Sequence, residues 1–436
     1  MSKNKRIVVT GLGPLSAIGM GKEALWKSVL AEKTGLTLEK YSINGQELGD
    51  YYAHRIKDFD INDFNIDKNI LEDIKAWKEQ ANPIDLFYLL AVVKLALSDS
   101  KINYTNRAET ERLGLIVTHE NPGLDQFYEE VINESYDFLV KGNNSVISRK
   151  DYFQEFYRKF AKRGYELQTF MPLFHLAKVF NIHNYSIFLC NACASGLFAV
   201  EAAADIIKSG KCNTVVVAGS DCTSIFKYLW FKGLDMYAED GKIKPFAKNR
   251  NGFVTGDGGA GIVLEDLYSA LERGAHIYAE YLGGGFHLEG WKVAMPEING
   301  DSYKKAIMQS LQRSDVPKEA IDLLVPHGVG TTAADYYEAK AITSIFGKNC
   351  KKPLMAALKP YIGHNLGSTA LLELAISILA LENNYLPKTL NLTEVDPKLG
   401  VNLVTTSKAY DMRTLMKTAC GFAGYNGSVI LKKYTK

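Results

Sequence analysis

The sequence predicts an α/β protein whose sheets are covered by helices. Short runs of valine, isoleucine and leucine alternate along the chain with longer segments of helical periodicity. Continuous apolar runs are typical of strands buried on both faces, and their alternation with helices is typical of layered α/β folds. The chain has 436 residues, of which 47% are hydrophobic and 23% charged, so it can bury a large core.

Seven segments are predicted as strands because each is dense in β-branched or aliphatic residues. In chain order they are residues 7–10, 113–118, 186–189, 214–218, 261–264, 323–325 and 429–432. Five segments between these strands have the spacing of helices. They are residues 84–98, 196–208, 302–314, 333–346 and 369–383.

Two stretches share one plan of a strand, a turn with a reactive residue, and a helix that opens with small residues. The first is 186–208, with Cys193 in its turn, and the second is 354–383, with His364 in its turn. Two copies of such a unit could place Cys193 and His364 at facing loop tips. The pattern therefore predicts one site built from distant parts of the chain.

The net charge and the apolar segments indicate whether the protein binds nucleic acid, is secreted or spans a membrane. A net charge of +2 gives no bulk attraction for nucleic acid, so no nucleic-acid partner is expected. The first apolar run reaches a turn at 11–14, too early for a secretory signal. The segment 369–381 contains Glu373 and is too short to cross a bilayer. We therefore expect no membrane span and a cytoplasmic location.

Cys193 is the candidate nucleophile. It lies in the turn 189–196, directly before a predicted helix whose N-terminus carries partial positive charge and favours a thiolate. The small residues after it would let backbone N–H groups approach a substrate carbonyl. Cys190 would complete a C-x-x-C motif, but no second cysteine pair or clustered histidine is near, so no metal site is expected. Cys190, Cys212 and Cys222 are expected to be inert.

Two histidines accompany this thiol. His327 lies in the turn 325–330 and His364 in the turn 358–367, both predicted to follow strands and to project into a cleft. Neutral imidazoles can donate through Nε2 to an enolate oxygen, and one can also move a proton. A thiol with two imidazoles indicates acyl transfer through a thioester, with carbanion chemistry on a second substrate.

Several motifs together resemble those of the β-ketoacyl synthases, the condensing enzymes of fatty-acid and polyketide assembly. They are 8–13 (Val-Val-Thr-Gly-Leu-Gly), 191–196 (Asn-Ala-Cys-Ala-Ser-Gly), the glycine-rich 244–261, His327, the Lys359 and His364 pair, and 421–428 (Gly-Phe-Ala-Gly-Tyr-Asn-Gly-Ser). The resemblance covers nearly the whole chain. It implies a duplicated thiolase-like five-layer αβαβα fold, with the cysteine in residues 1–266 and both histidines in residues 267–436.

The activity that this resemblance implies is decarboxylative Claisen condensation. An acyl group would move from acyl carrier protein to Cys193, and malonyl-carrier protein would then lose carbon dioxide. The enolate, held by His327 and His364, would attack the thioester and give a 3-oxoacyl product. No cofactor is expected, because phosphopantetheine of the carrier protein holds the substrates. The implied partners are acyl carrier protein and a synthase-like subunit, in a homodimer or a heterodimer.

Further site residues follow by matching the family's motifs to this sequence. Lys359 would orient the histidine site, and Glu338 would pair with it. The backbone N–H groups of the nucleophile and of Phe422 would form the oxyanion hole, and the Phe422 side chain would gate the acyl pocket. Thr331 and Asn426 are the other implied substrate-binding residues.

Five positions depart from the family pattern, and two of them are Ala247 and Asn251, which stand where the family has aspartates. Ala294 and Val329 stand where threonines usually contact the phosphopantetheine arm. The loss of two such contacts should weaken recognition of the arm by roughly 1 kcal/mol per hydrogen bond. Ala423 replaces the glycine after the gating phenylalanine and should restrict that loop. These changes favour a specialised synthase, such as one of a secondary metabolic pathway.

Three alternatives stay open. A thiolase is one, because Cys420 precedes Gly421 as in the late cysteine motif of thiolases, although His327 and Lys359 favour a synthase. A chain-length partner in a synthase heterodimer is another, since fold alone does not fix function, although Cys193 is intact. The third is a malonyl-carrier-protein decarboxylase or initiation subunit, which would use the same histidines.

The segment 124–168 is rich in tyrosine, phenylalanine and charge and is enlarged compared with the family. Its spacing indicates an amphipathic helix with one apolar face, made by Phe153, Phe156, Tyr157 and Phe160. A basic cluster lies beside that face: Arg158, Lys159, Lys162 and Arg163. A helix packed on one face is favoured, and docking of an acidic carrier protein at 158–163 is the further hypothesis.

Overall fold

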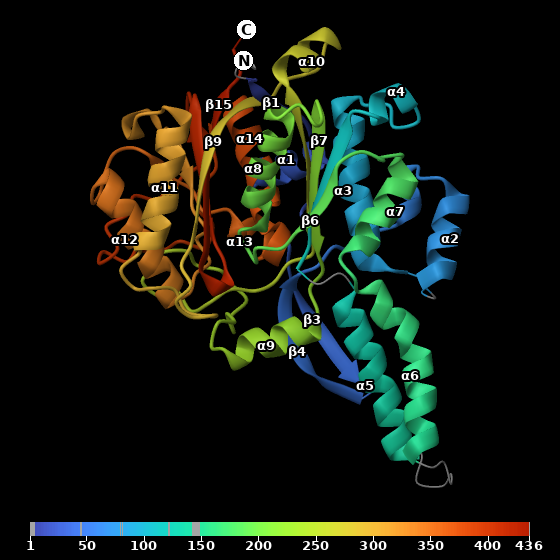
Figure 1. The fold of residues 1–436 in the computed structure, drawn as a ribbon. Helices are drawn as coiled ribbons and strands as arrows, with labels where there is room; N and C mark the ends of the chain where they lie inside the picture. Colours follow the sequence, from blue (N-terminus) through green and yellow to red (C-terminus); the bar gives the residue numbers. More distant parts are fainter. Residues whose placement is uncertain are drawn as a thin grey trace.

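The computed structural model contains one long mixed sheet flanked by helices (Figure 1). The residues that it describes are 5–43, 46–78, 80, 82–120, 123–141 and 149–435. The earlier strands of this sheet are β1 (Ile7–Ser16), β2 (Gly19–Met20), β5 (Leu113–Thr118), β6 (Ser186–Leu189), β7 (Thr214–Asp221) and β8 (Gly258–Asp266). The later strands are β9 (Ala279–Leu288), β10 (Leu323–Val325), β11 (Leu354–Met355), β14 (Thr414–Cys420) and β15 (Tyr425–Lys433).

Two short ribbons lie outside this sheet. They are the hairpin of β3 (Leu36–Ile43) and β4 (Gln46–His54), and the pair β12 (Tyr385–Leu386) and β13 (Lys408–Ala409). The helices of the first half are α1 (Lys22–Leu30), α2 (Lys68–Lys78), α3 (Ile84–Ser100), α4 (Arg107–Thr110), α5 (Leu124–Lys141), α6 (Arg149–Glu166), α7 (Phe170–Phe180), α8 (Ser195–Lys208) and α9 (Ile225–Gly233). Those that follow are α10 (Leu267–Glu272), α11 (Asp301–Ser314), α12 (Thr332–Phe346), α13 (Lys359–Ile362) and α14 (Thr369–Glu382).

The sheet repeats one strand order. From edge to middle, its first half runs β6-β5-β7-β8-β1 and its second half runs β11-β10-β14-β15-β9. Numbered one to five along the chain, the strands of either half follow the order 3-2-4-5-1. The halves meet where β1 pairs antiparallel with β9, at Val8 and Glu280. This repeat supports our proposal that the chain divides near residue 266.

The helices form three layers around the two half-sheets. The central layer is α8 and α14, which contact strands of both halves (Figure 1). Helix α3 packs on β1, β7 and β8 from the outer side, while α11 packs on β9 and β15 and carries α12. The result is the αβαβα arrangement, and the fold class predicted from the sequence is confirmed.

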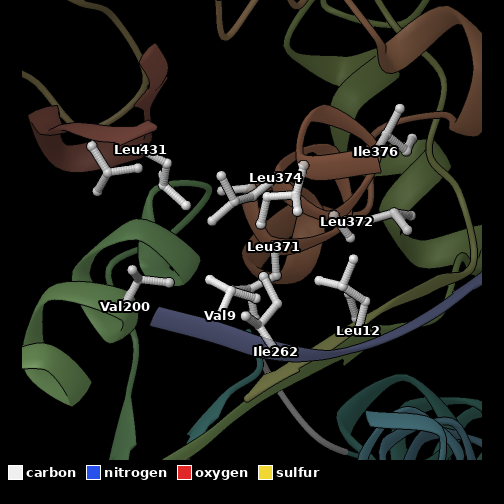
Figure 2. Close-up of a cluster of buried hydrophobic side chains, with 14 of the residues drawn as sticks. Val9, Leu12, Val200, Ile262, Leu371, Leu372, Leu374, Ile376 and Leu431 are labelled. Atoms are coloured by element: carbon white, nitrogen blue, oxygen red, sulfur yellow. The ribbon is translucent and has the colours of Figure 1, made fainter. Parts of the chain in front are cut away.

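The apolar core holds the central layer in place. Figure 2 shows Leu371, Leu372 and Leu374 of α14 among side chains of β1, β8 and α8, including Val9 and Val200. Residues 369–381 of α14 are buried on every face. Each fully buried leucine of this kind stabilises the fold by about 1.5–3 kcal/mol. Because α14 cannot shift without opening this core, the residues just before it have fixed positions.

A helical hairpin of α5 and α6 projects from the body of the protein (Figure 1). It corresponds to the predicted enlarged segment, but the predicted apolar face is wrong at Tyr157. Phe160 is buried against the ring of Phe127, whereas the Tyr157 side chain is 76% exposed. The side chains of Phe153, Phe156, Lys159 and Lys162 lie outside the described residues.

The predicted elements agree with the observed ones, and the omissions have local causes. Every predicted strand lies inside an observed strand, and every predicted helix overlaps an observed helix. Strand β9 was not predicted because three glycines, Gly283, Gly284 and Gly285, interrupt its apolar pattern. Strand β14 was not predicted because Lys417 interrupts its apolar run. No helix within the described ranges is both long and apolar enough to cross a membrane.

The close crossing of α8 and α14 generates a prediction. A Cβ atom at Gly196 would lie 2.9 Å from the backbone nitrogen of Leu371 and 2.7 Å from its Cγ. We expect Gly196→Ala to lower the free energy of unfolding by about 1–3 kcal/mol, because α14 cannot move away. Urea denaturation measures this change. Gly164→Ala on α6 is the control, since a Cβ there meets no atom within 4 Å. Equal unfolding midpoints for both variants would contradict the prediction.

Candidate functional site

The predicted site residues converge on one cavity, whose empty space is about 740 Å³ when the part open to solvent is included. The sequence places them far apart, but the repeated strand order brings the ends of β6, β10 and β14 to the same face. The predicted residues that line the cavity are Cys193, His327, Thr331, His364, Phe422 and Asn426. Lys359 and Glu338 lie behind this wall, and both are fully buried.

A strained turn presents Cys193 to the cavity. Ala192 has a φ of 48°, in the left-handed region, which costs an alanine about 1 kcal/mol. The Ser195 hydroxyl braces the turn by donating to the Ala192 carbonyl at 2.6 Å and accepting from the Asn191 N–H at 2.7 Å. The next residues begin α8, so the thiol lies at the N-terminus of that helix.

The thiol itself is deeply set, and its pKa lies above the ordinary value. Burial raises the pKa of Cys193, and Glu120 raises it further, while Lys359 acts in the opposite direction. The N-terminus of α8, which was predicted to favour the thiolate, therefore opposes the effect of burial, which favours the protonated thiol.

Hydrogen bonds fix the tautomer of each histidine. The Thr369 hydroxyl accepts from the backbone N–H of Asn365 and lies 3.0 Å from Nδ1 of His364, to which it can donate its own proton. Nζ of Lys359 donates to Nδ1 of His327 at 3.4 Å. Because Nδ1 of each ring accepts, each Nε2 retains its hydrogen. The arrangement supplies two N–H donors.

Both imidazoles are neutral. Burial lowers the pKa of His327 and of His364 well below the usual value, and the positive charge of Lys359 lowers both further. Their rings lie with centroids 5.5 Å apart, at an interplanar angle of 77°. Two neutral N–H donors in a buried cavity can stabilise a developing oxyanion or enolate without themselves carrying charge.

A buried ion-pair network supports the histidines from behind. Glu373 of α14 lies 3.1 Å from Nζ of Lys359 and 2.8 Å from Nζ of Lys417. Lys359 also donates to the backbone carbonyl of His327, and Lys417 donates to that of Pro326 at 3.0 Å. The network therefore fixes both the backbone and the ring of His327.

The predicted pairing of Glu338 with Lys359 is wrong. Glu338 on α12 instead accepts the backbone N–H groups of His327 at 2.7 Å and Gly328 at 2.8 Å, and the hydroxyl of Tyr303. It holds the turn, and Glu373 pairs with the lysine. A signal for Glu373 was present in the sequence, because a carboxylate inside an otherwise apolar helix must have a buried partner.

The gating loop touches the nucleophile turn. A Cβ at Gly421 would lie 3.0 Å from the backbone nitrogen of Cys193. Phe422 packs on Trp230 and Phe231, with ring centroids 5.7 and 6.2 Å away. Ala423 has a φ of 59°, and its N–H donates to the Val293 carbonyl. An alanine in a conformation that favours glycine ties this loop to the cavity mouth.

The cavity mouth has fewer polar groups than the family pattern implies. Val329 and Ala294 line it, and the Thr331 hydroxyl caps α12 by accepting from the Ala334 N–H at 3.3 Å. Asn426 accepts from the Tyr337 hydroxyl at 2.9 Å and so braces the loop. Substrate contact by Thr331 and Asn426 remains a proposal.

Two local expectations need correction. Cys190 is exposed at the end of β6, because this strand lies at the sheet edge, whereas Cys212 and Cys222 are buried as expected. His364 does not directly follow a strand, because the short helix α13 comes between β11 and its turn. Among the described residues, no group of three or more His, Cys, Asp or Glu side chains could hold a metal ion.

The buried network predicts a large effect of one neutral substitution. Glu373→Gln leaves two buried lysines without a counter-charge, so we expect the free energy of unfolding to fall by about 3–5 kcal/mol. Glu382→Gln on the same helix removes only a half-exposed pair with His276 and should cost less than about 1 kcal/mol. Urea denaturation of both variants tests the contrast, and a small effect of Glu373→Gln would show that the network is dispensable.

The neutral histidines predict a pH dependence of stability. Because the pKa of His364 is lowered on folding, the unfolded chain binds more protons below its ordinary value of about 6.5. Above that pH, His364 should therefore make no pH-dependent contribution to the free energy of unfolding. Below it, stability should fall by about 1.4 kcal/mol per pH unit. We expect His364→Gln to flatten this slope between pH 6.5 and 5.5 in urea titrations. Parallel slopes would contradict a neutral His364.

Comparison with known proteins agrees with this geometry. Residues 4–270 match the β-ketoacyl synthase N-terminal domain, and residues 278–393 match its C-terminal domain. The chain is 27% identical over 444 residues to the 3-oxoacyl-[acyl-carrier-protein] synthase 2 of Coxiella burnetii, with 99% of each sequence covered.

Solved structures extend the comparison. The ishigamide ketosynthase/chain length factor matches with a TM-score of 0.84 and 26% identity, over 99% of this chain and 100% of that one. A type II polyketide acyl-carrier protein in complex with its hexaketide-bound ketosynthase, AntDE:AntF, matches with a TM-score of 0.77 and 20% identity, over 99% and 100%. The latter shows the fold alone. Since the two domain patterns span most of the chain in the order that its motifs predicted, the protein belongs to the β-ketoacyl synthase family.

Proposed function

We propose that this protein catalyses decarboxylative Claisen condensation of an acyl thioester with malonyl-acyl carrier protein. The observation that carries the proposal is one buried cavity shared by a cysteine thiol and two neutral imidazoles. Such a set can form a thioester and then stabilise an enolate beside it. The product would be a 3-oxoacyl-acyl carrier protein.

In the first half-reaction, the sulfur of Cys193 attacks the incoming acyl thioester. The backbone N–H groups of Cys193 and Phe422 would receive the negative charge that develops on the carbonyl oxygen. The phosphopantetheine thiol leaves with the proton that Cys193 gives up. The contact of Gly421 with the nucleophile turn supports this oxyanion hole, because it brings the gating loop to the Cys193 N–H.

In the second half-reaction, the malonyl group loses carbon dioxide and leaves an enolate. His327 and His364 would donate their Nε2 hydrogens to its oxygen. The enolate carbon attacks the acyl group on Cys193, forming the new carbon–carbon bond as the bond to sulfur breaks. The cysteine sulfur then takes a proton, and free enzyme is restored. Lys359, Glu338 and Glu373 serve as positioning residues.

The proposed partners are acyl carrier protein and a second synthase-like subunit. The relative from Coxiella burnetii is named for a carrier-protein substrate, and the ishigamide structure pairs a ketosynthase with a chain length factor. Edge strand β6 is exposed or half-exposed and could extend its sheet with another chain. Arg158 on α6 is exposed, while Arg163 pairs with Glu130. A cytoplasmic location is part of this proposal.

A malonyl-carrier-protein decarboxylase is the second candidate. Burial and Glu120 both disfavour the Cys193 thiolate, while both histidines are fully arranged for the enolate. An enzyme of that kind would release carbon dioxide and acetyl-carrier protein without elongation. The two functions differ only in whether Cys193 receives an acyl group.

Intact mass spectrometry distinguishes these candidates. We expect wild-type protein, incubated with a panel of acyl-carrier proteins and malonyl-carrier protein, to show an acyl adduct and a 3-oxoacyl product. Cys193→Ala should abolish both, because the nucleophile is gone, yet still release carbon dioxide from malonyl-carrier protein. Acetyl-carrier protein without an adduct would support the decarboxylase instead. Neither an adduct nor carbon dioxide loss, from any substrate, would overturn the proposed function.

A further inference from the structure

A carboxyl group shares the cavity with the nucleophile. Glu120 follows strand β5 and lines the cavity together with Cys193. Its proximity is also electrostatic, because Glu120 raises the pKa of the Cys193 thiol. The mechanism proposed above does not use this side chain.

Glu120 is partly buried and lines the cavity beside the turn before α14. The mouth is exposed, with Val293 at 71% and Met295 at 50%, whereas Cys193 is 8% exposed. The Glu120 backbone packs beside Gly367, whose Cβ would lie 3.4 Å from the Glu120 nitrogen in the buried turn before α14. In the proposed reaction a phosphopantetheine arm would enter through this mouth, and an acyl group on Cys193 that extends away from it would pass the wall that carries Glu120.

Two carboxylates, Asp221 and Asp125, and one lysine, Lys227, lie near Glu120. Asp221 accepts from the Glu120 N–H at 3.4 Å and from the Ser368 N–H at 3.0 Å. The nearby cation, Lys227, forms an ion pair with Asp125 at 3.0 Å. The Glu120 carboxyl group itself has no hydrogen bond or ion pair within the described part of the chain. An apolar chain placed against such a group would leave it desolvated and unpartnered, which is costly.

We propose that Glu120 selects acyl groups that carry a hydrogen-bond donor, a hydroxyl or an ammonium, near the thioester. The inference rests on the proposed acylation of Cys193 and adds the class of acyl substrate. A donor on the chain compensates the partly buried carboxyl group when the chain covers it, whereas a plain alkyl chain does not. Discrimination by a buried hydrogen bond is stronger than discrimination by size alone.

The test compares three chains of matched length. Butyryl, 3-hydroxybutyryl and 3-aminobutyryl groups are loaded on the same acyl carrier protein, and the initial rate of Cys193 acylation is read by intact mass. We expect the wild type to acylate at least one donor-bearing chain about tenfold faster than butyryl, the equivalent of one hydrogen bond. Glu120→Leu should remove that preference. Glu120→Gln, which keeps the shape and loses the charge, should retain a preference for hydroxyl and lose one for ammonium.

Control measurements separate the possible failures. Glu129→Gln on the exposed face of α5 should leave the three rates in their wild-type ratio. Thermal unfolding and carbon dioxide release from malonyl-carrier protein report whether each Glu120 variant is folded. If Glu120→Leu does not fold, the inference is tested by comparing the ratios of the three acylation rates in Glu120→Gln with those in the wild type. Wild-type acylation that is as fast with butyryl as with both other chains overturns this inference and leaves the proposed function intact. Absence of acylation by every chain instead counts against the proposed function.

Discussion

The ion pair of Glu373 with Lys359 and Lys417 is the interaction on which the site depends. Removing three charged groups from water is costly, and the cost is offset only because each lysine also donates to backbone carbonyls of the His327 turn. Two lysines against one carboxylate leave positive charge behind the histidines. Together with burial, that charge keeps both imidazoles neutral, so their N–H groups remain available to an anionic intermediate.

Duplication explains how such a site can be assembled from residues far apart. Both half-sheets have the same strand order, and each contributes one buried helix to the central layer. The N-terminus of α8 follows Cys193, and the N-terminus of α14 follows His364. The contact of Gly196 with Leu371 fixes the crossing of these helices. The distance between Cys193 and His364 is therefore set by core packing, and loops have little freedom to change it.

The departures from the family pattern concentrate at the cavity wall. Val329 and Ala294 make the mouth less polar, while Ala423 holds the gating loop in a left-handed turn bonded to Val293. Glu120 adds a partly buried carboxyl group to the wall. The residues that carry the chemistry and those that select the acyl group therefore lie in different parts of the site. The rigid core carries the catalytic groups, and single side chains on the wall can alter which acyl group is accepted.

The sequence by itself determined the alternation of elements, the family, and the residues that carry chemistry, because apolar periodicity and glycine-marked turns are local properties. Cys193, His327 and His364 could be singled out in this way. The tertiary structure alone decided which charges meet. Glu338 and Glu373 are both carboxylates on helices, and only the packing of α14 between the half-sheets brings Glu373, and not Glu338, to Lys359. Likewise, nothing local to Glu120 reveals that it lines the same cavity as Cys193, because that placement depends on the pairing of β5 with its neighbours and on the turn before α14.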